Sequence, residues 1–209
     1  MSRLVYLHGF ASGPGSYKAQ YLQQQLALRG RQLDIPDLNR GGFYDLTITR
    51  QIDQVTQLIA APAQPVTLIG SSFGGLTAAW VAESCLQVER LVLLAPAFEF
   101  LVHLQAHLGG QYSRWQQEGQ LPVYHHAYGQ EVPLGYQFVT DLMQYSDSCL
   151  KRSLPTHIVH GERDAVIPPS ASQRYQQGRA WVTLDLVDDD HSLTHALRDI
   201  WKQLQLTIA

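Results

Sequence analysis

Apolar residues follow two alternating patterns along this chain, which predict strands and helices in turn. Short runs of β-branched and other apolar residues, such as the one at 66–69, are typical of strands that are buried on both faces of a sheet. Between these runs, apolar residues recur at helical spacing, as they do from 48 to 59. We therefore expect strands at 4–8, 31–35, 66–69, 90–95, 156–160 and 181–187, and helices at 16–29, 48–59, 169–177 and 193–205, with a further helix directly after residue 72.

This alternation predicts an α/β fold with a mainly parallel six-stranded sheet and helices on both of its faces. With the strands numbered along the chain, the expected order is 2-1-3-4-5-6. In open α/β sheets a site lies beyond the carboxyl ends of the strands, at the point where the strand order reverses. The loops after the strands at 4–8 and 66–69 are therefore the first place to look for chemistry.

Residues 98–150 interrupt the alternation. We expect helices in the first part of this segment, then a hairpin with strands near 122–128 and 132–139 around Gly129-Gln130. The segment is rich in aromatic residues, with Phe98, Phe100, Tyr112, Trp115, Tyr124, Tyr128, Tyr136 and Phe138. It is either a cap over the site or an insertion that packs to one side. We predict the cap, which divides the chain into a core (1–97 and 151–209) and a cap insertion (98–150).

The segment at 66–75, VTLIGSSFGG, is the most informative motif in the chain. It fits G-x-S-x-G between a predicted strand and a predicted helix, which is the context of a nucleophile elbow. Small glycine flanks leave room for a serine at a sharp turn, and its hydroxyl projects above the sheet edge. Ser72 is therefore the candidate nucleophile. In the alternative interpretation, Ser71 or Ser72 only caps the helix.

A serine nucleophile needs a base and a group that orients the base. Asp164 follows the predicted strand at 156–160, and His191 follows the strand at 181–187. Both positions lie in loops at the expected edge of the sheet, and we assign Asp164 and His191 to these roles. Glu162 competes with Asp164, and His195 competes with His191.

Two backbone N–H groups are candidates for an oxyanion hole. One is the N–H of Phe73, which follows the nucleophile, and the other is the N–H of Phe10, in the loop after the first strand. Gly9 would let the backbone approach a substrate. We expect His8 to hold this loop by hydrogen bonds and not to act as a base.

The Ser…Asp…His order, GSSFGG and the opening YLHGFASGPGSYKAQYL together resemble the α/β-hydrolase superfamily, and within it the small bacterial esterases of the YqiA type. The resemblance implies carboxylic-ester hydrolysis, a cytoplasmic location and no cofactor. It also implies that Ser72, Asp164 and His191 form a catalytic triad. The segment 98–150 departs from that family because it looks longer and more aromatic than the family's insert, so specificity does not carry over.

Composition narrows the classes of function. The chain has 209 residues, of which 45% are hydrophobic, and a net charge of −3. It can bury a sizeable single core, and it lacks the basic surface of a nucleic-acid-binding protein. Met1 leads directly into the first strand, so we expect no signal peptide, and no apolar run is long enough to span a bilayer.

The histidines and cysteines do not predict a metal centre. His103 and His107 are four residues apart and His125 and His126 are adjacent, but no matching carboxylate pattern accompanies them. We interpret them as polar residues of the insertion and predict no metal. The two cysteines, Cys85 and Cys149, are far apart in the sequence, and we expect free thiols instead of the alternative disulfide.

These features together predict a cytoplasmic serine hydrolase that cleaves small carboxylic esters through an acyl-enzyme. Its partner would be a small-molecule acyl ester, with no role for nucleic acid, membrane, metal or cofactor. Thioester hydrolysis and acyl transfer use the same groups and stay open as alternatives. A protein of another class, which binds a small ligand on this fold without turnover, is the remaining alternative.

Overall fold

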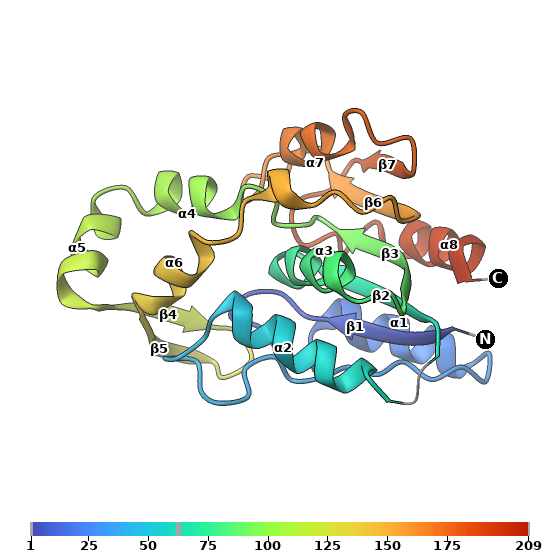
Figure 1. Cartoon of the computed structure of the whole chain (residues 1–209), viewed down its shortest axis with the longest axis horizontal. Coiled ribbons are helices and arrows are strands. Elements are labelled where there is room, and N and C mark those ends of the chain that lie inside the picture. Colours follow the sequence, from blue (N-terminus) through green and yellow to red (C-terminus); the bar gives the residue numbers. More distant parts are fainter. Residues whose placement is uncertain (1, 62–63, 209) are drawn as a thin grey trace.

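The computed structural model describes residues 2–61 and 64–208 and is built around one parallel sheet (Figure 1). In the described part of the chain this sheet has five strands, in the order β1-β2-β3-β6-β7. The strands are β1 (Arg3–Leu7), β2 (Val66–Ser71), β3 (Val88–Leu94), β6 (Thr156–Gly161) and β7 (Val182–Val187). All four neighbouring pairs are parallel, so the carboxyl ends of the strands meet at one edge of the sheet.

The prediction of a sixth strand at 31–35 is wrong for the described part of the chain. This segment lies beside β1, as the predicted order requires, but only Asp34 pairs with it. The Asp34 N–H donates to the Leu4 carbonyl at 3.0 Å, and the Tyr6 N–H donates to the Asp34 carbonyl at 2.8 Å. Pro36 follows directly and has no N–H to continue the ladder, and only Leu33 and Ile35 supply apolar side chains. The pairing therefore stops after a single bridge.

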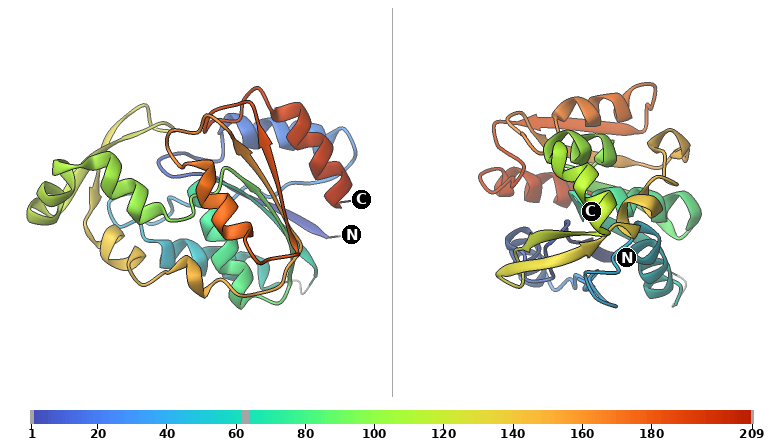
Figure 2. Two further views of the ribbon diagram at one scale, coloured as in Figure 1. Left: turned by 90° about the horizontal axis from the view of Figure 1, so that it is seen from above. Right: turned by 90° about the vertical axis from the view of Figure 1, so that its left-hand side faces the viewer.

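Helices cover both faces of the sheet (Figure 2). One face carries α1 (Tyr17–Ala27) and α8 (Leu197–Ile208), and the other carries α2 (Ile48–Ile59), α3 (Phe73–Ser84) and α7 (Pro169–Gln176). Side chains alternate between the two faces along β1: Leu4 and Tyr6 pack with α1 and α8, while Val5 and Leu7 pack on the α2 and α3 side. None of the helices in residues 2–61 and 64–208 is long and apolar enough to cross a membrane.

The last helix begins at Leu197, four residues later than predicted. Leu193 has a φ of +52°, a left-handed conformation that interrupts a helix. The N–H groups of His195 and Ala196 donate to the Asp189 carboxylate at 2.8 and 2.9 Å, which satisfies donors just before the helix. His195 therefore lies before α8, whereas the helix predicted at 193–205 would include it.

The segment between β3 and β6 extends beyond the carboxyl ends of the strands (Figure 1). It contains α4 (Phe100–Leu108), α5 (Gly110–Glu118), β4 (Gln120–His125), β5 (Gln130–Gly135), α6 (Gln137–Leu142) and the short 3-10 helix η1 (Asp147–Cys149). Strands β4 and β5 form an antiparallel pair, which confirms the predicted hairpin. Its second strand ends at Gly135, earlier than predicted, because α6 takes the residues from 137 onward.

Candidate active site

The turn between β2 and α3 is a sharp elbow at Ser72. Ser72 has φ +55° and ψ −121°, a backbone conformation that side-chain-bearing residues rarely adopt. A Cβ on Gly70 would lie 2.5 Å from the Gly74 carbonyl oxygen, and one on Gly74 would lie 2.2 Å from the Leu7 carbonyl oxygen. Only glycine fits at these two positions, so the G-x-S-x-G spacing follows directly from the close approach of β1, β2 and α3.

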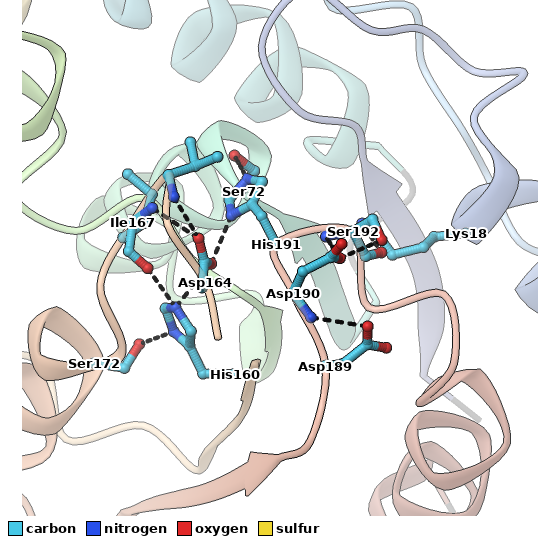
Figure 3. Close-up of polar contacts among 11 residues, drawn as sticks. Lys18, Ser72, His160, Asp164, Ile167, Ser172, Asp189, Asp190, His191 and Ser192 are labelled. Carbon is cyan, nitrogen blue, oxygen red and sulfur yellow. Dashed lines mark hydrogen bonds and ion pairs between the residues drawn. The ribbon is translucent and has the colours of Figure 1, made fainter. Parts of the chain in front are cut away.

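The Ser72 hydroxyl does not cap the helix that follows it. Its Oγ lies 2.9 Å from Nε2 of His191, which reaches it from the loop after β7 (Figure 3). Ser71, in contrast, ends β2 and is buried. Of the two serines, Ser72 is therefore the one in contact with the predicted base.

The other nitrogen of the same imidazole, Nδ1 of His191, lies 2.6 Å from Oδ2 of Asp164. The Asp164 side chain is completely buried, and its Oδ1 accepts hydrogen bonds from the N–H groups of Val166 and Ile167, both at 2.9 Å. The structure thus brings Ser72, His191 and Asp164 together from three loops at the sheet edge, in a continuous line of hydrogen bonds (Figure 3).

The competing residues lie elsewhere. Glu162 is exposed to solvent, and no hydrogen bond joins it to His191. The His195 ring contacts Asp189 at 3.2 Å and is mostly exposed. Asp190 accepts hydrogen bonds from the backbone N–H and the hydroxyl of Ser192.

A residue that the sequence analysis missed, His160, lies behind Asp164. Its Nε2 is 3.1 Å from Oδ2 of Asp164 and 2.9 Å from the Ile167 carbonyl oxygen, and its Nδ1 is 2.8 Å from the Ser172 hydroxyl. Burial by itself would raise the pKa of the Asp164 carboxyl. The hydrogen bonds from His160, His191 and the Ile167 N–H outweigh it and hold that pKa well below its usual range. Asp164 is therefore a stable carboxylate, and the only sequence signal for His160 was its spacing of four residues before Asp164.

The predicted oxyanion donors lie in the expected segments. Among the described residues, none accepts a hydrogen bond from the N–H of Phe10 or of Phe73. A Cβ on Gly9 would lie only 3.8 Å from Oγ of Ser72, so the loop after β1 passes directly beside that hydroxyl. His8 holds this loop as expected, because its Nε2 accepts the Leu38 N–H at 3.0 Å while its Nδ1 lies 3.0 Å from the Gly9 carbonyl oxygen. Burial lowers the pKa of His8.

Two spaces meet at the site. A cleft of about 680 Å³ contains Ser72 and His191, and Lys18 and Arg163 are among its lining residues. A second cavity of about 390 Å³ lies between α4, α5, β4 and the core, and most of its lining is apolar: Phe10, Phe100, Leu104, Trp115, Leu121 and Val123. The cleft and the cavity share Phe10, His126 and Val166, so they adjoin one another.

The histidines of the insertion are dispersed. His103 faces Glu99 at 3.7 Å, His125 stacks on Tyr128 with ring centroids 3.8 Å apart, and His126 is exposed at the cleft. Within residues 2–61 and 64–208, no three His, Cys, Asp or Glu side chains are grouped as metal ligands would be. Both cysteines are free thiols, as predicted, with Cys85 partly buried and Cys149 exposed.

Comparison with known proteins supports the fold. The sequence profile of the uncharacterised protein family UPF0227 matches residues 3–209. No curated protein matches the sequence. A protein from Agrobacterium vitis S4 superposes with a TM-score of 0.85 at 22% identity, covering 100% of this chain and 88% of that one. Est1E from Butyrivibrio proteoclasticus superposes with a TM-score of 0.80 at 18% identity, covering 99% of this chain and 86% of that one. Mouse alpha/beta hydrolase domain-containing protein 10 superposes with a TM-score of 0.77 at 19% identity, covering 99% of this chain and 90% of that one. The predicted α/β-hydrolase fold and the resemblance to YqiA-type proteins are confirmed.

Proposed function

Because the chain belongs to protein family UPF0227 and has the α/β-hydrolase fold, we propose that it is a serine hydrolase that cleaves small carboxylic esters. The observation that carries the proposal is the unbroken line of hydrogen bonds from Ser72 through His191 to Asp164 at the sheet edge. A serine, a base and an orienting carboxylate in hydrogen-bond contact make up the standard apparatus for acyl transfer. No metal or cofactor is required for such a reaction.

The geometry suggests how the proton moves. If Nδ1 of His191 carries a proton and donates a hydrogen bond to the Asp164 carboxylate, then Nε2 is free to accept the proton of the Ser72 hydroxyl. Ser72 Oγ then forms a bond to the ester carbonyl carbon, and His191 returns the proton to the departing alcohol as the ester bond breaks. Water repeats the cycle on the acyl-enzyme, which releases the acid and restores Ser72.

Negative charge on the carbonyl oxygen would be stabilised by the N–H groups of Phe10 and Phe73. Neither has a hydrogen-bond partner in the described part of the chain, and the second lies at the start of α3, where the helix dipole favours negative charge. Removing one such donor typically costs two to three orders of magnitude in rate, so these amides would contribute strongly to catalysis.

The apolar cavity beside Phe10 suits the acyl part of the substrate, and in this proposal residues 98–150 act as the cap that encloses it. A volume of about 390 Å³ holds a short to medium acyl chain or an aromatic acid. Est1E, whose fold this chain shares, has been solved with ferulic acid bound, which supports an apolar or aromatic acyl group of this size.

The test is active-site labelling combined with substitution of the nucleophile. A fluorophosphonate should label the wild-type protein at Ser72, and Ser72→Ala should lower the turnover of a generic aryl ester by about three to six orders of magnitude. Ser71→Ala is the matched control, because Ser71 is the last residue of β2 and the hydrogen bond to His191 comes from Ser72.

Labelling at Ser71, or undiminished turnover by Ser72→Ala, would overturn the assignment of the nucleophile. Binding of aryl esters without any turnover by the wild-type protein would favour the non-catalytic alternative. A matched series of esters and thioesters, assayed with the same two variants, distinguishes ester hydrolysis from its thioester alternative.

A further inference from the structure

Lys18 is a charged residue that lines the Ser72 cleft. It belongs to the opening motif YLHGFASGPGSYKAQYL, but the proposed mechanism does not use it. It lies in the first turn of α1, and its side chain is partly buried. Its Nζ donates to the carbonyl oxygen of Ser192 at 2.6 Å, across 174 residues of sequence. Figure 3 shows Lys18 beyond Ser192, on the opposite side of the His191 loop from Asp164.

The Lys18 ammonium has hydrogen-bonding capacity to spare. It carries three N–H donors, and the Ser192 carbonyl is its one acceptor among the described residues. No carboxylate of residues 2–61 or 64–208 lies within ion-pair distance of it. A partly buried ammonium without a carboxylate partner is unfavourable by itself. Two donors and a positive charge without a carboxylate in direct contact are thus available to a molecule in the cleft.

The other charged groups around the cleft are engaged. Arg163 pairs with Asp188. The Asp190 carboxylate accepts from the N–H and hydroxyl of Ser192, and the buried Asp189 carboxylate accepts from the N–H groups of His195 and Ala196. Of the two cations that line the cleft, Arg163 thus has a carboxylate in direct contact, and Lys18 has none among the described residues.

The protonation state of Lys18 fits a binding role. Burial lowers the pKa of Lys18 to about 8, while the carboxylates of Asp189, Asp190 and Asp164 act in the opposite direction. The other titratable groups that line the same cleft are Arg163, Asp190, His126, His191, Tyr6 and Tyr17. Lys18 is therefore mostly cationic at neutral pH and loses its charge as the pH rises through about 8.

We propose that Lys18 binds an anionic group, a carboxylate or a phosphate, on the alcohol part of the ester substrate. This inference rests on the proposed ester hydrolysis. If the apolar cavity takes the acyl group, the adjoining cleft that contains Ser72, His191 and Lys18 is left for the alcohol. A charge-assisted hydrogen bond from Lys18 would then select alcohols that carry an anion several bonds away from the ester oxygen.

The experiment compares pairs of substrates that differ only in charge. The acetate esters of para- and meta-hydroxybenzoate are the carboxylate probes, and the acetate ester of para-hydroxyphenyl phosphate is the phosphate probe. The acetate esters of para- and meta-hydroxybenzamide are the neutral partners of the two carboxylate probes, and the para isomer also serves as the neutral reference for the phosphate probe. The measured quantity is the ratio of kcat/KM for the anionic ester to that for its neutral partner, in the wild-type protein, in Lys18→Met and in Lys18→Arg.

We expect this ratio to fall roughly ten- to hundredfold in Lys18→Met and to be largely kept in Lys18→Arg, as is typical for the loss of a hydrogen bond to a charged group. In the wild-type protein the ratio should also fall as the pH rises through about 8, a measurement that does not depend on the folding of any variant. The carboxylate and phosphate probes show which anion the cleft prefers.

An equal loss for charged and neutral esters in Lys18→Met would mean that Lys18 only holds the His191 loop, and the proposal would be wrong. A wild-type ratio near one that does not change with pH would overturn it as well. Either result can be interpreted only if the wild-type protein hydrolyses the neutral esters and Ser72→Ala does not. Without that turnover, the proposed ester hydrolysis itself fails.

Discussion

The sheet edge and the insertion that faces it are held in place by different forces. At the sheet edge, strand topology and hydrogen bonds fix each polar side chain, and Asp164 alone accepts from two histidine rings and two backbone N–H groups. The insertion is joined to the core by hydrogen bonds, such as those between Asp141 and Thr49, and also by a cluster of aromatic rings. Phe73 lies 4.9 Å from Phe100 and 5.4 Å from Phe138 between ring centroids, and it links the elbow helix to the segment above it.

Directional and non-directional forces suit different tasks. Hydrogen bonds hold reacting groups to within a fraction of an ångström, which acyl transfer requires. Apolar packing tolerates changes of shape better, since volume-conserving substitutions in a core usually cost little. We therefore expect substitutions at the sheet edge to change the rate of the reaction, and substitutions in the insertion to change which substrate is taken.

The largest effect is expected at the hydrogen bonds of the sheet edge. Asp164→Asn should lower kcat roughly a hundred- to ten-thousandfold, because an amide that donates to His191 favours the tautomer that cannot accept the serine proton. Glu162→Gln is the matched control, since Glu162 lies two residues away in the same loop and is exposed. Steady-state kinetics on one aryl ester measures both. A comparable loss in the two variants would show that the loop as a whole, and not Asp164, supports His191.

A smaller effect is expected when the apolar cavity is filled. Leu104→Trp would remove room for about three methylenes, and at roughly 0.8 kcal/mol each this predicts a loss near fiftyfold in kcat/KM for the longest acyl chain accepted. A small fluorophosphonate should still label Ser72. Leu86→Trp, at a position that is 81% exposed and outside the cavity, is the control. An unchanged chain-length profile in Leu104→Trp would contradict the cap, which until then stays a prediction.

The smallest effect concerns stability where the insertion returns to the core. Oδ2 of Asp147 accepts the Glu99 N–H at 2.6 Å, and burial raises the pKa of Asp147 to about 6 from its ordinary 3.8. A carboxyl whose pKa is raised by folding stabilises the protein below its ordinary pKa, and this contribution is lost as the pH rises through about 6. Asp147→Asn keeps an acceptor without the charge. The free energy of unfolding of Asp147→Asn, relative to that of the wild type, should therefore rise by roughly 1 to 3 kcal/mol from acidic to mildly alkaline pH.

Urea unfolding at several pH values measures this difference. The matched control is Asp53→Asn, at an exposed position on α2. If the difference in unfolding free energy between Asp147→Asn and wild type does not vary with pH, folding does not raise the pKa of Asp147, and the prediction is wrong.

Features of the fold that depend on residues close together in the sequence could be predicted from the sequence. The elbow is one, because glycine spacing, a preceding apolar run and a following helix all lie within a few residues of Ser72. The order of the five strands is another, since parallel strands joined through helices have few allowed arrangements. Asp164 and His191 could be proposed because each follows a recognisable strand.

Other features depend on contacts between distant parts of the chain, and only the tertiary structure decided them. The segment at 31–35 has strand-like residues, yet pairing with β1 stops at Asp34 because a proline follows. His160 read as one more strand residue until the fold placed its ring against Asp164. Lys18 is 174 residues from Ser192, and no local pattern links a residue of the first helix to the His191 loop. Periodicity and turn chemistry are local, whereas burial, charge pairing and the shape of a cavity arise only when remote segments pack together.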